Sequence, residues 1–135
     1  MFFEYALTIP ANTPAAAPVE LDAPLAPGTV ARVDVQFPAG CRDLVHVSIW
    51  REQHQVWPVN LDGHITSEGQ TVSWPEDYDL DDEPFTFTLR GWSPNTDFPH
   101  VITFRFALLP LETAQSARGA GGLVSRLARF LGVSQ

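Results

Sequence analysis

The chain has 135 residues, of which 44% are hydrophobic and 11% aromatic, and its formal net charge at pH 7 is −8. This length suits one domain with a single core, and the apolar content excludes an intrinsically disordered chain. All 16 carboxylate side chains but only five of the eight arginines lie within residues 1–112, which makes this acidic body a poor partner for nucleic acid.

Apolar and polar residues alternate along three segments of the first third of the chain. Residues 2–9 place four apolar side chains on one face, Phe3, Tyr5, Leu7 and Ile9, and this period of two predicts a strand. A Pro/Ala-rich stretch follows and contains a short extended piece near residues 19–21, where proline favours an edge position. Residues 29–37 then alternate again and end at a Pro-Ala-Gly turn.

Five further strands are predicted between residues 44 and 109. They cover residues 44–51, 55–58, 70–74, 85–92 and 100–109, and the first two form a hairpin around a polar turn. No helical period occurs before residue 110. The sequence therefore predicts an all-β domain over residues 1–110, an antiparallel β-sandwich of jelly-roll or immunoglobulin-like type.

The last 25 residues have a different pattern, which predicts a separate arm over residues 111–135. Gly119–Gly122 form a flexible joint, and residues 123–133 predict a short amphipathic helix. Its apolar face carries Val124, Leu127, Phe130 and Leu131, and its cationic side chains include Arg126 and Arg129. A helix this short needs a surface to lie on, so we expect it to dock on a partner protein; docking on its own sandwich or on a membrane are the alternatives.

An acidic segment over residues 76–83 contains six carboxylates in eight residues. Asp77, Asp79 and Asp81 have the spacing with which a calcium loop begins, although Asp82 stands where such a loop needs glycine. Calcium is the one cofactor that the sequence suggests. The alternative is a solvated connection between strands that binds no cation, or one that contacts a basic partner surface.

Two of the four tryptophans, Trp50 and Trp92, fall on the outward-facing positions of their strands. Exposed indoles on a sandwich face are typical of protein interfaces, and we expect these two to contact a partner. The alternative function is a carbohydrate-binding module, because aromatic rings also stack on sugar rings, with calcium at the acidic segment as a further element.

Catalytic and targeting motifs are not found in the sequence. The four histidines show no short ligand spacing, no serine lies in a glycine-flanked nucleophile elbow, and Cys41 is the single cysteine, so we expect no enzyme. We also expect no signal peptide and no membrane anchor, because the N-terminus lacks a basic region followed by an apolar one and no run approaches about 20 apolar residues.

Three segments carry a resemblance to a known group: FFEYALTIP at residues 2–10, TVARVDVQFPAGCRDLVHV at residues 29–47 and QVWP at residues 55–58. Over about residues 2–110 the chain resembles small uncharacterised β proteins of tailed phages and prophages. The resemblance implies a virion structural protein, of the capsid decoration, cement or minor tail type. It also implies protein subunits as partners, in a larger assembly or a homo-oligomer, and a location in the virion or the host cytoplasm.

Overall fold

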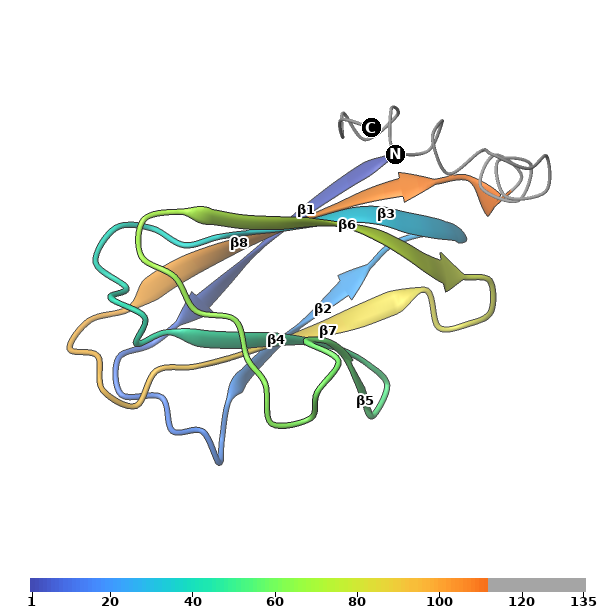
Figure 1. The fold of residues 1–135 in the computed structure, drawn as a ribbon. Coiled ribbons are helices and arrows are strands. Elements are labelled where there is room, and N and C mark those ends of the chain that lie inside the picture. The colour runs from blue at the N-terminus through green and yellow to red at the C-terminus, as the bar shows by residue number, and fades with distance from the viewer. Residues whose placement is uncertain (112–135) are drawn as a thin grey trace.

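The computed structural model describes residues 1–111, and within them it contains eight β-strands (Figure 1). The strands are β1 (Phe2–Ile9), β2 (Val19–Pro24), β3 (Gly28–Gln36), β4 (His46–Arg51), β5 (His54–Trp57), β6 (Thr71–Leu80), β7 (Thr86–Trp92) and β8 (His100–Leu109). The predicted all-β class is confirmed. Apart from Leu111, the predicted arm lies outside the described residues, including its helix and the contact residues Val124, Arg126, Leu127, Arg129, Phe130 and Leu131.

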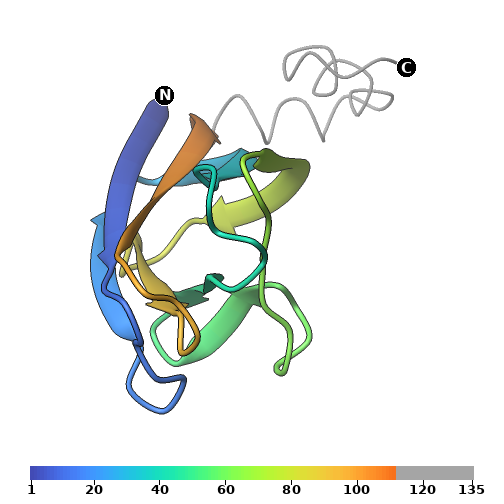
Figure 2. The ribbon, with the colours of Figure 1, turned by 90° about the vertical axis from the view of Figure 1, so that its left-hand side faces the viewer.

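The strands form two antiparallel sheets of four, which lie one above the other (Figures 1 and 2). One sheet has the order β1-β8-β3-β6 and the other β2-β7-β4-β5. The pairing is nested: β1 pairs with β8, β2 with β7, β3 with β6, and β4 with β5. Each sheet therefore combines strands that are far apart in the sequence, and β5 and β6 are edge strands of different sheets.

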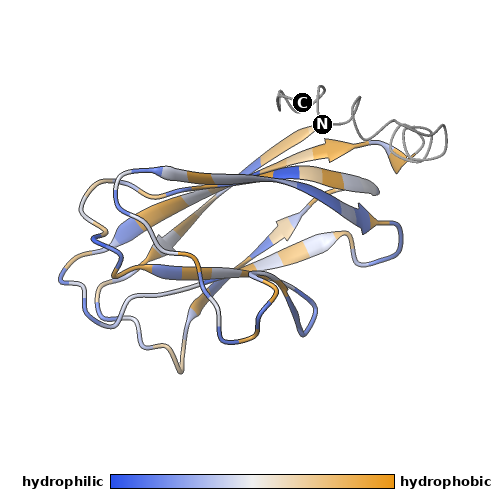
Figure 3. Cartoon of the chain, viewed as in Figure 1, coloured by the Kyte–Doolittle hydropathy of each residue, from blue (hydrophilic) through white to orange (hydrophobic). Residues whose placement is uncertain are grey.

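One hydrophobic core fills the space between the sheets. The alternation of apolar and polar residues along the strands (Figure 3) places Val33 and Val35 of β3, Phe104 and Phe106 of β8, and Phe87 of β7 inside, each fully buried. The inward face predicted for β1 is confirmed, because Leu7 and Ile9 are buried and Phe3 and Tyr5 are half-buried, while the alternate residues of the strand are exposed. The described part contains no helix long and apolar enough to cross a membrane.

Strand β6 corrects the sequence prediction. It runs over Thr71–Leu80 and not only over residues 70–74, and it contains the first half of the acidic segment. The alternation continues because Glu76 and Tyr78 are half-buried and Leu80 is buried, whereas Asp77 and Asp79 are exposed. Pro75 does not end the strand, since β6 pairs only with β3 and a proline is tolerated at a sheet edge.

Candidate functional site

An apolar groove of about 300 Å³ lies at the side of the sandwich where β5 and β6 form the sheet edges. It is lined by Trp57 at the end of β5, by Val72 and Trp74 of β6, and by Pro58 and Ile65. Because neither edge strand pairs with the other, the core is not closed by a backbone ladder on this side.

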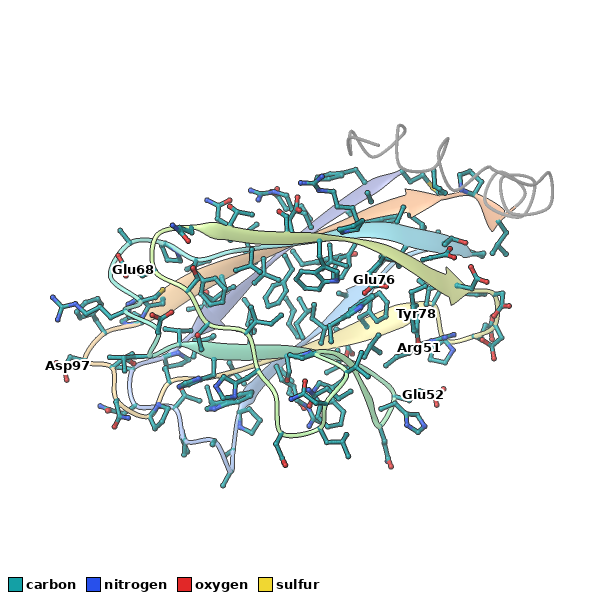
Figure 4. The ribbon with its side chains drawn as sticks, in the orientation of Figure 1. Arg51, Glu52, Glu68, Glu76, Tyr78 and Asp97 are labelled. Carbon is teal, nitrogen blue, oxygen red and sulfur yellow. The ribbon has the colours of Figure 1, made fainter. Side chains whose placement is uncertain are left out.

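A single carboxylate joins the two sheets behind this groove. Oε1 of Glu76 accepts hydrogen bonds from the indole Nε1 of Trp57, at 2.7 Å, and from the indole Nε1 of Trp74, at 3.1 Å. Glu76 can reach both because it lies on the core-facing side of β6, two residues after Trp74, and points between the sheets (Figure 4). The bond to Trp57 crosses from one sheet to the other and fixes the indole that forms the groove wall.

Sequence reasoning missed this site. Trp74 and Glu76 have the i, i+2 spacing that puts two side chains on one face of a strand, and that signal was present. The sequence prediction treats the acidic segment as a connection between strands. In a connection, alternation does not specify which way the Glu76 side chain points, so its pairing with Trp74 is not predicted.

A second, polar pocket of about 210 Å³ lies further along the same side, lined by Arg51, Glu52, His54, Tyr78, Asp82 and Glu83. The guanidinium of Arg51, the one arginine of this pocket, forms its hydrogen bonds within the chain. Nη2 donates to the backbone oxygen of Asp82 at 2.6 Å and to Oδ1 of Asp82 at 3.0 Å, and Nε donates to the Pro84 oxygen. Burial lowers the pKa of Arg51, but hydrogen bonds with Tyr78 and Asp82 outweigh it and raise the pKa above its ordinary value. The guanidinium thus holds a turn in place (Figure 4).

An exposed apolar loop borders the groove. It begins at Pro58 and ends at Ile65, which both line the groove, and between them the side chains of Val59 and Leu61 are 80% and 74% exposed. Nε2 of Gln55 donates to three backbone oxygens of this loop, and Ile65 exchanges two backbone hydrogen bonds with Val47. Val59 and Leu61 are therefore exposed to solvent on a loop whose backbone is held by hydrogen bonds.

Trp50 and Trp92 lie on the outer face of the β2-β7-β4-β5 sheet, as their strand positions predicted. The guanidinium carbon of Arg90 lies 4.0 Å from the centre of the Trp50 ring, and the His46 ring stacks on Trp92 at 5.7 Å. Each indole is half-buried and has a ring face covered by its own chain.

Two histidines pack beside Trp92. The rings of His46 and His64 meet edge to face at 4.5 Å, and Nδ1 of His46 is buried with no hydrogen-bond partner among the described residues. Burial, and secondarily the charge of His64, lowers the pKa of His46. The two imidazoles therefore favour the neutral state of His46 in the folded chain.

The three aspartates proposed for calcium do not form a loop. Asp77 and Asp79 are exposed positions of strand β6, Asp79 accepts a hydrogen bond from Thr29 Oγ1 at 2.6 Å, and Asp81 follows the strand. An extended strand holds alternate residues about 6.5–7 Å apart, whereas a calcium loop must curl its ligands around one point. Among residues 1–111, no group of three or more His, Cys, Asp or Glu side chains is placed to hold a metal ion.

The turn that contains Cys41 is held together by Glu68 from a distant loop. Oε1 of Glu68 accepts the backbone N–H groups of Gly40 and Arg42 at 2.9 and 2.8 Å. Gly40, Arg42 and Asp43 all have positive φ, so the backbone curves around the carboxylate. Burial, followed by the charges of Glu68 and Asp43, raises the pKa of the Cys41 thiol to about 11, which makes it an unreactive core residue.

The comparisons with known proteins add no family to these observations. No family model matches the chain, and none of the curated proteins compared with it matches it either.

Proposed function

We propose that this chain is a non-enzymatic structural subunit of a larger protein assembly. The assembly that we propose is a phage virion, in which the chain serves as a capsid decoration, cement or minor tail protein. The observation that carries the proposal is apolar surface on the β5–β6 side: a groove of about 300 Å³, and two exposed aliphatic residues, Val59 and Leu61, in the loop between the groove residues Pro58 and Ile65. Exposed apolar surface of this kind marks sites of protein contact.

The strand order supports the same class of protein. A nested arrangement, β1-β8-β3-β6 above β2-β7-β4-β5, is what results when one long hairpin is rolled up, and we assign it to the jelly-roll type and not to the immunoglobulin type. Jelly rolls are common in viral capsid proteins, although they also occur in lectins and cupins. The strand order supports the virion proposal by analogy of fold.

Within the groove, the chemistry favours protein contact over catalysis or sugar binding. Its lining is two indoles, a proline and two aliphatic side chains, and it includes no Ser, Cys or His that could act as nucleophile or base. A sugar site requires several convergent polar groups beside its aromatic rings. Near this groove the carboxylate of Glu76 is already engaged by the two indoles that form the wall.

The proposal is tested by asking whether the chain enters particles. Tagged full-length protein is expressed in the host strain, virions are released and purified on a gradient, and the chain is quantified in the particle fraction. We expect it to co-sediment with particles in a fixed ratio to the major capsid or tail protein. Recovery only from the fraction free of particles would overturn the virion proposal.

A matched pair of variants then tests the surface. Leu61→Asp changes a side chain that is 74% exposed beside the groove, and Phe98→Asp changes one that is 57% exposed elsewhere. Both should fold, since neither side chain is part of the core. We expect incorporation into particles to fall at least tenfold for Leu61→Asp and to remain unchanged for Phe98→Asp.

A further inference from the structure

We propose that the outer edge of β1, which no strand of the described residues occupies, pairs with the same edge of a second copy of this chain, antiparallel, to form a continuous eight-stranded sheet. This inference concerns a surface different from the groove and does not depend on the virion proposal.

Hydrogen bonds at the start of β1 show which backbone groups are free. The N-terminal nitrogen of Met1 donates to the Leu108 oxygen, and Leu108 N donates to the Met1 oxygen, each at 2.7 Å. In an antiparallel ladder such doubly bonded pairs alternate with unbonded ones. The odd residues of β1 are therefore bonded to β8, and Phe2, Glu4, Ala6 and Thr8 direct their N–H and C=O groups away from it, toward the open edge.

Among the four edge strands of the described part, the other three carry features that block pairing. Strand β5 has only four residues, β6 has Pro75 in its middle and aspartates on its exposed face, and β2 ends in Pro24 and follows Pro18. These are the devices that protect sheet edges. Strand β1 has eight residues, FFEYALTI, with no proline. Its one charge, on Glu4, is paired with Arg105 at 2.8 Å.

The side chains favour a register that keeps the two Glu4 carboxylates apart. With Glu4 opposite Ala6 of the second copy, Phe2 lies opposite Thr8 and Tyr5 opposite the second Tyr5, and the even residues form bonded pairs. Phe2 is 62% exposed, and Val101, which is 46% exposed, is the β8 partner of Thr8. In this register Phe2 of the second copy, Thr8 and Val101 lie side by side in one row across three neighbouring strands, with Thr8 between the two apolar side chains. Shifting the register by one bonded pair in one direction places Glu4 opposite Glu4, where like charges repel.

Sedimentation equilibrium of the full chain at rising concentrations tests the proposal. We expect the wild type to be a concentration-dependent dimer and Ala6→Pro to be a monomer, because position 6 directs its N–H to the open edge and proline removes that donor without breaking a bond to β8. A wild type that remains monomeric would overturn the proposal, as would a dimer that Ala6→Pro leaves intact.

Two charged variants at the same position, Ala6→Glu and Ala6→Lys, test the register. They also replace Ala6→Pro as the test of dimerisation if proline prevents folding. Ala6→Glu places a carboxylate opposite Glu4 of the second copy, and Ala6→Lys places an ammonium there. We expect about tenfold weaker dimerisation for Ala6→Glu and no weakening for Ala6→Lys. Thr103→Glu adds the same charge to the strand next to β1, directly opposite Ala6, and serves as the control. Equal weakening by all three variants would contradict edge pairing.

Discussion

The two sheets meet in different ways along the two sides of the sandwich. On the β1–β2 side, Ile9 packs directly on the backbone of Gly91 in β7, where an added Cβ atom would lie 2.3 Å from Ile9 Cδ1. On the β5–β6 side, a groove of about 300 Å³ remains, and the contact between Glu76 and Trp57 holds the sheets together there. Close packing leaves no apolar hollow at the contact between Ile9 and Gly91, whereas the groove on the β5–β6 side leaves apolar surface that a partner would bury.

The largest effect should come from filling the tight side. Gly91→Ala forces a methyl group against the fully buried Ile9, and we expect it to lower the free energy of unfolding by about 2–3 kcal/mol, measured by urea denaturation. Ile9→Val removes the Cδ1 atom that would clash most. In the double variant the loss should therefore be at least about 1 kcal/mol smaller than the sum of the two single losses. Additive losses would show that the contact is not the cause.

A somewhat smaller effect is expected at the carboxylate that bridges the open side. Glu76→Ala leaves two indole N–H groups without their acceptor, and because Glu76 is half-exposed we expect a loss of about 2 kcal/mol. Glu76→Gln keeps an amide oxygen as acceptor and should lose about half as much. Tyr5→Phe, which removes the hydrogen bond from the Tyr5 hydroxyl to the Pro24 oxygen on the tight side, should cost about 1 kcal/mol. If Tyr5→Phe cost more than Glu76→Ala, the bridge would not be what holds the open side.

The third effect depends on pH and arises on the outer face, away from both sides. Because the folded pKa of His46 is lowered, the unfolded chain takes up a proton first as the pH falls through the ordinary value of 6.5, and the folded state loses stability from there down to its own pKa. The wild type should therefore lose more stability than His46→Gln between pH 7.5 and 5.5, as measured by urea denaturation at each pH. His54→Gln makes the same exchange of residue type at an exposed position of β5 and is the matched control for His46→Gln.

The smallest effect is predicted inside the groove. Val72→Ile adds one methylene to a half-buried groove wall, where space exists, so the free energy of unfolding should change by no more than about 0.5 kcal/mol. Gly91→Ala adds a group of similar size to the tight side. Comparable destabilisation by the two variants would mean that the groove is not open in solution.

Much of the fold could be predicted from alternation alone, and the site could not. Strands such as β1 and β8 alternate regularly, so their inward faces follow from the sequence, and β8 has the predicted bounds. The predicted range of β6 ended too early, at residue 74. Pro75 and the acidic residues after it indicated a loop, although the alternation continues through Glu76, Tyr78 and Leu80. The groove depends on Trp57 and Trp74, which belong to different sheets, and strand order is a property of long-range pairing that no local pattern specifies.

The proposed role of the open side can be measured directly by hydrogen–deuterium exchange of the full chain, free and bound to purified virions. We predict that the amides of residues 59–65, in the loop that carries Val59 and Leu61, exchange at least tenfold more slowly in the particle, while those of residues 15–17, in the turn between β1 and β2, are unchanged. Unchanged exchange at residues 59–65 in a particle-bound chain would contradict the account, because the partner would then sit elsewhere.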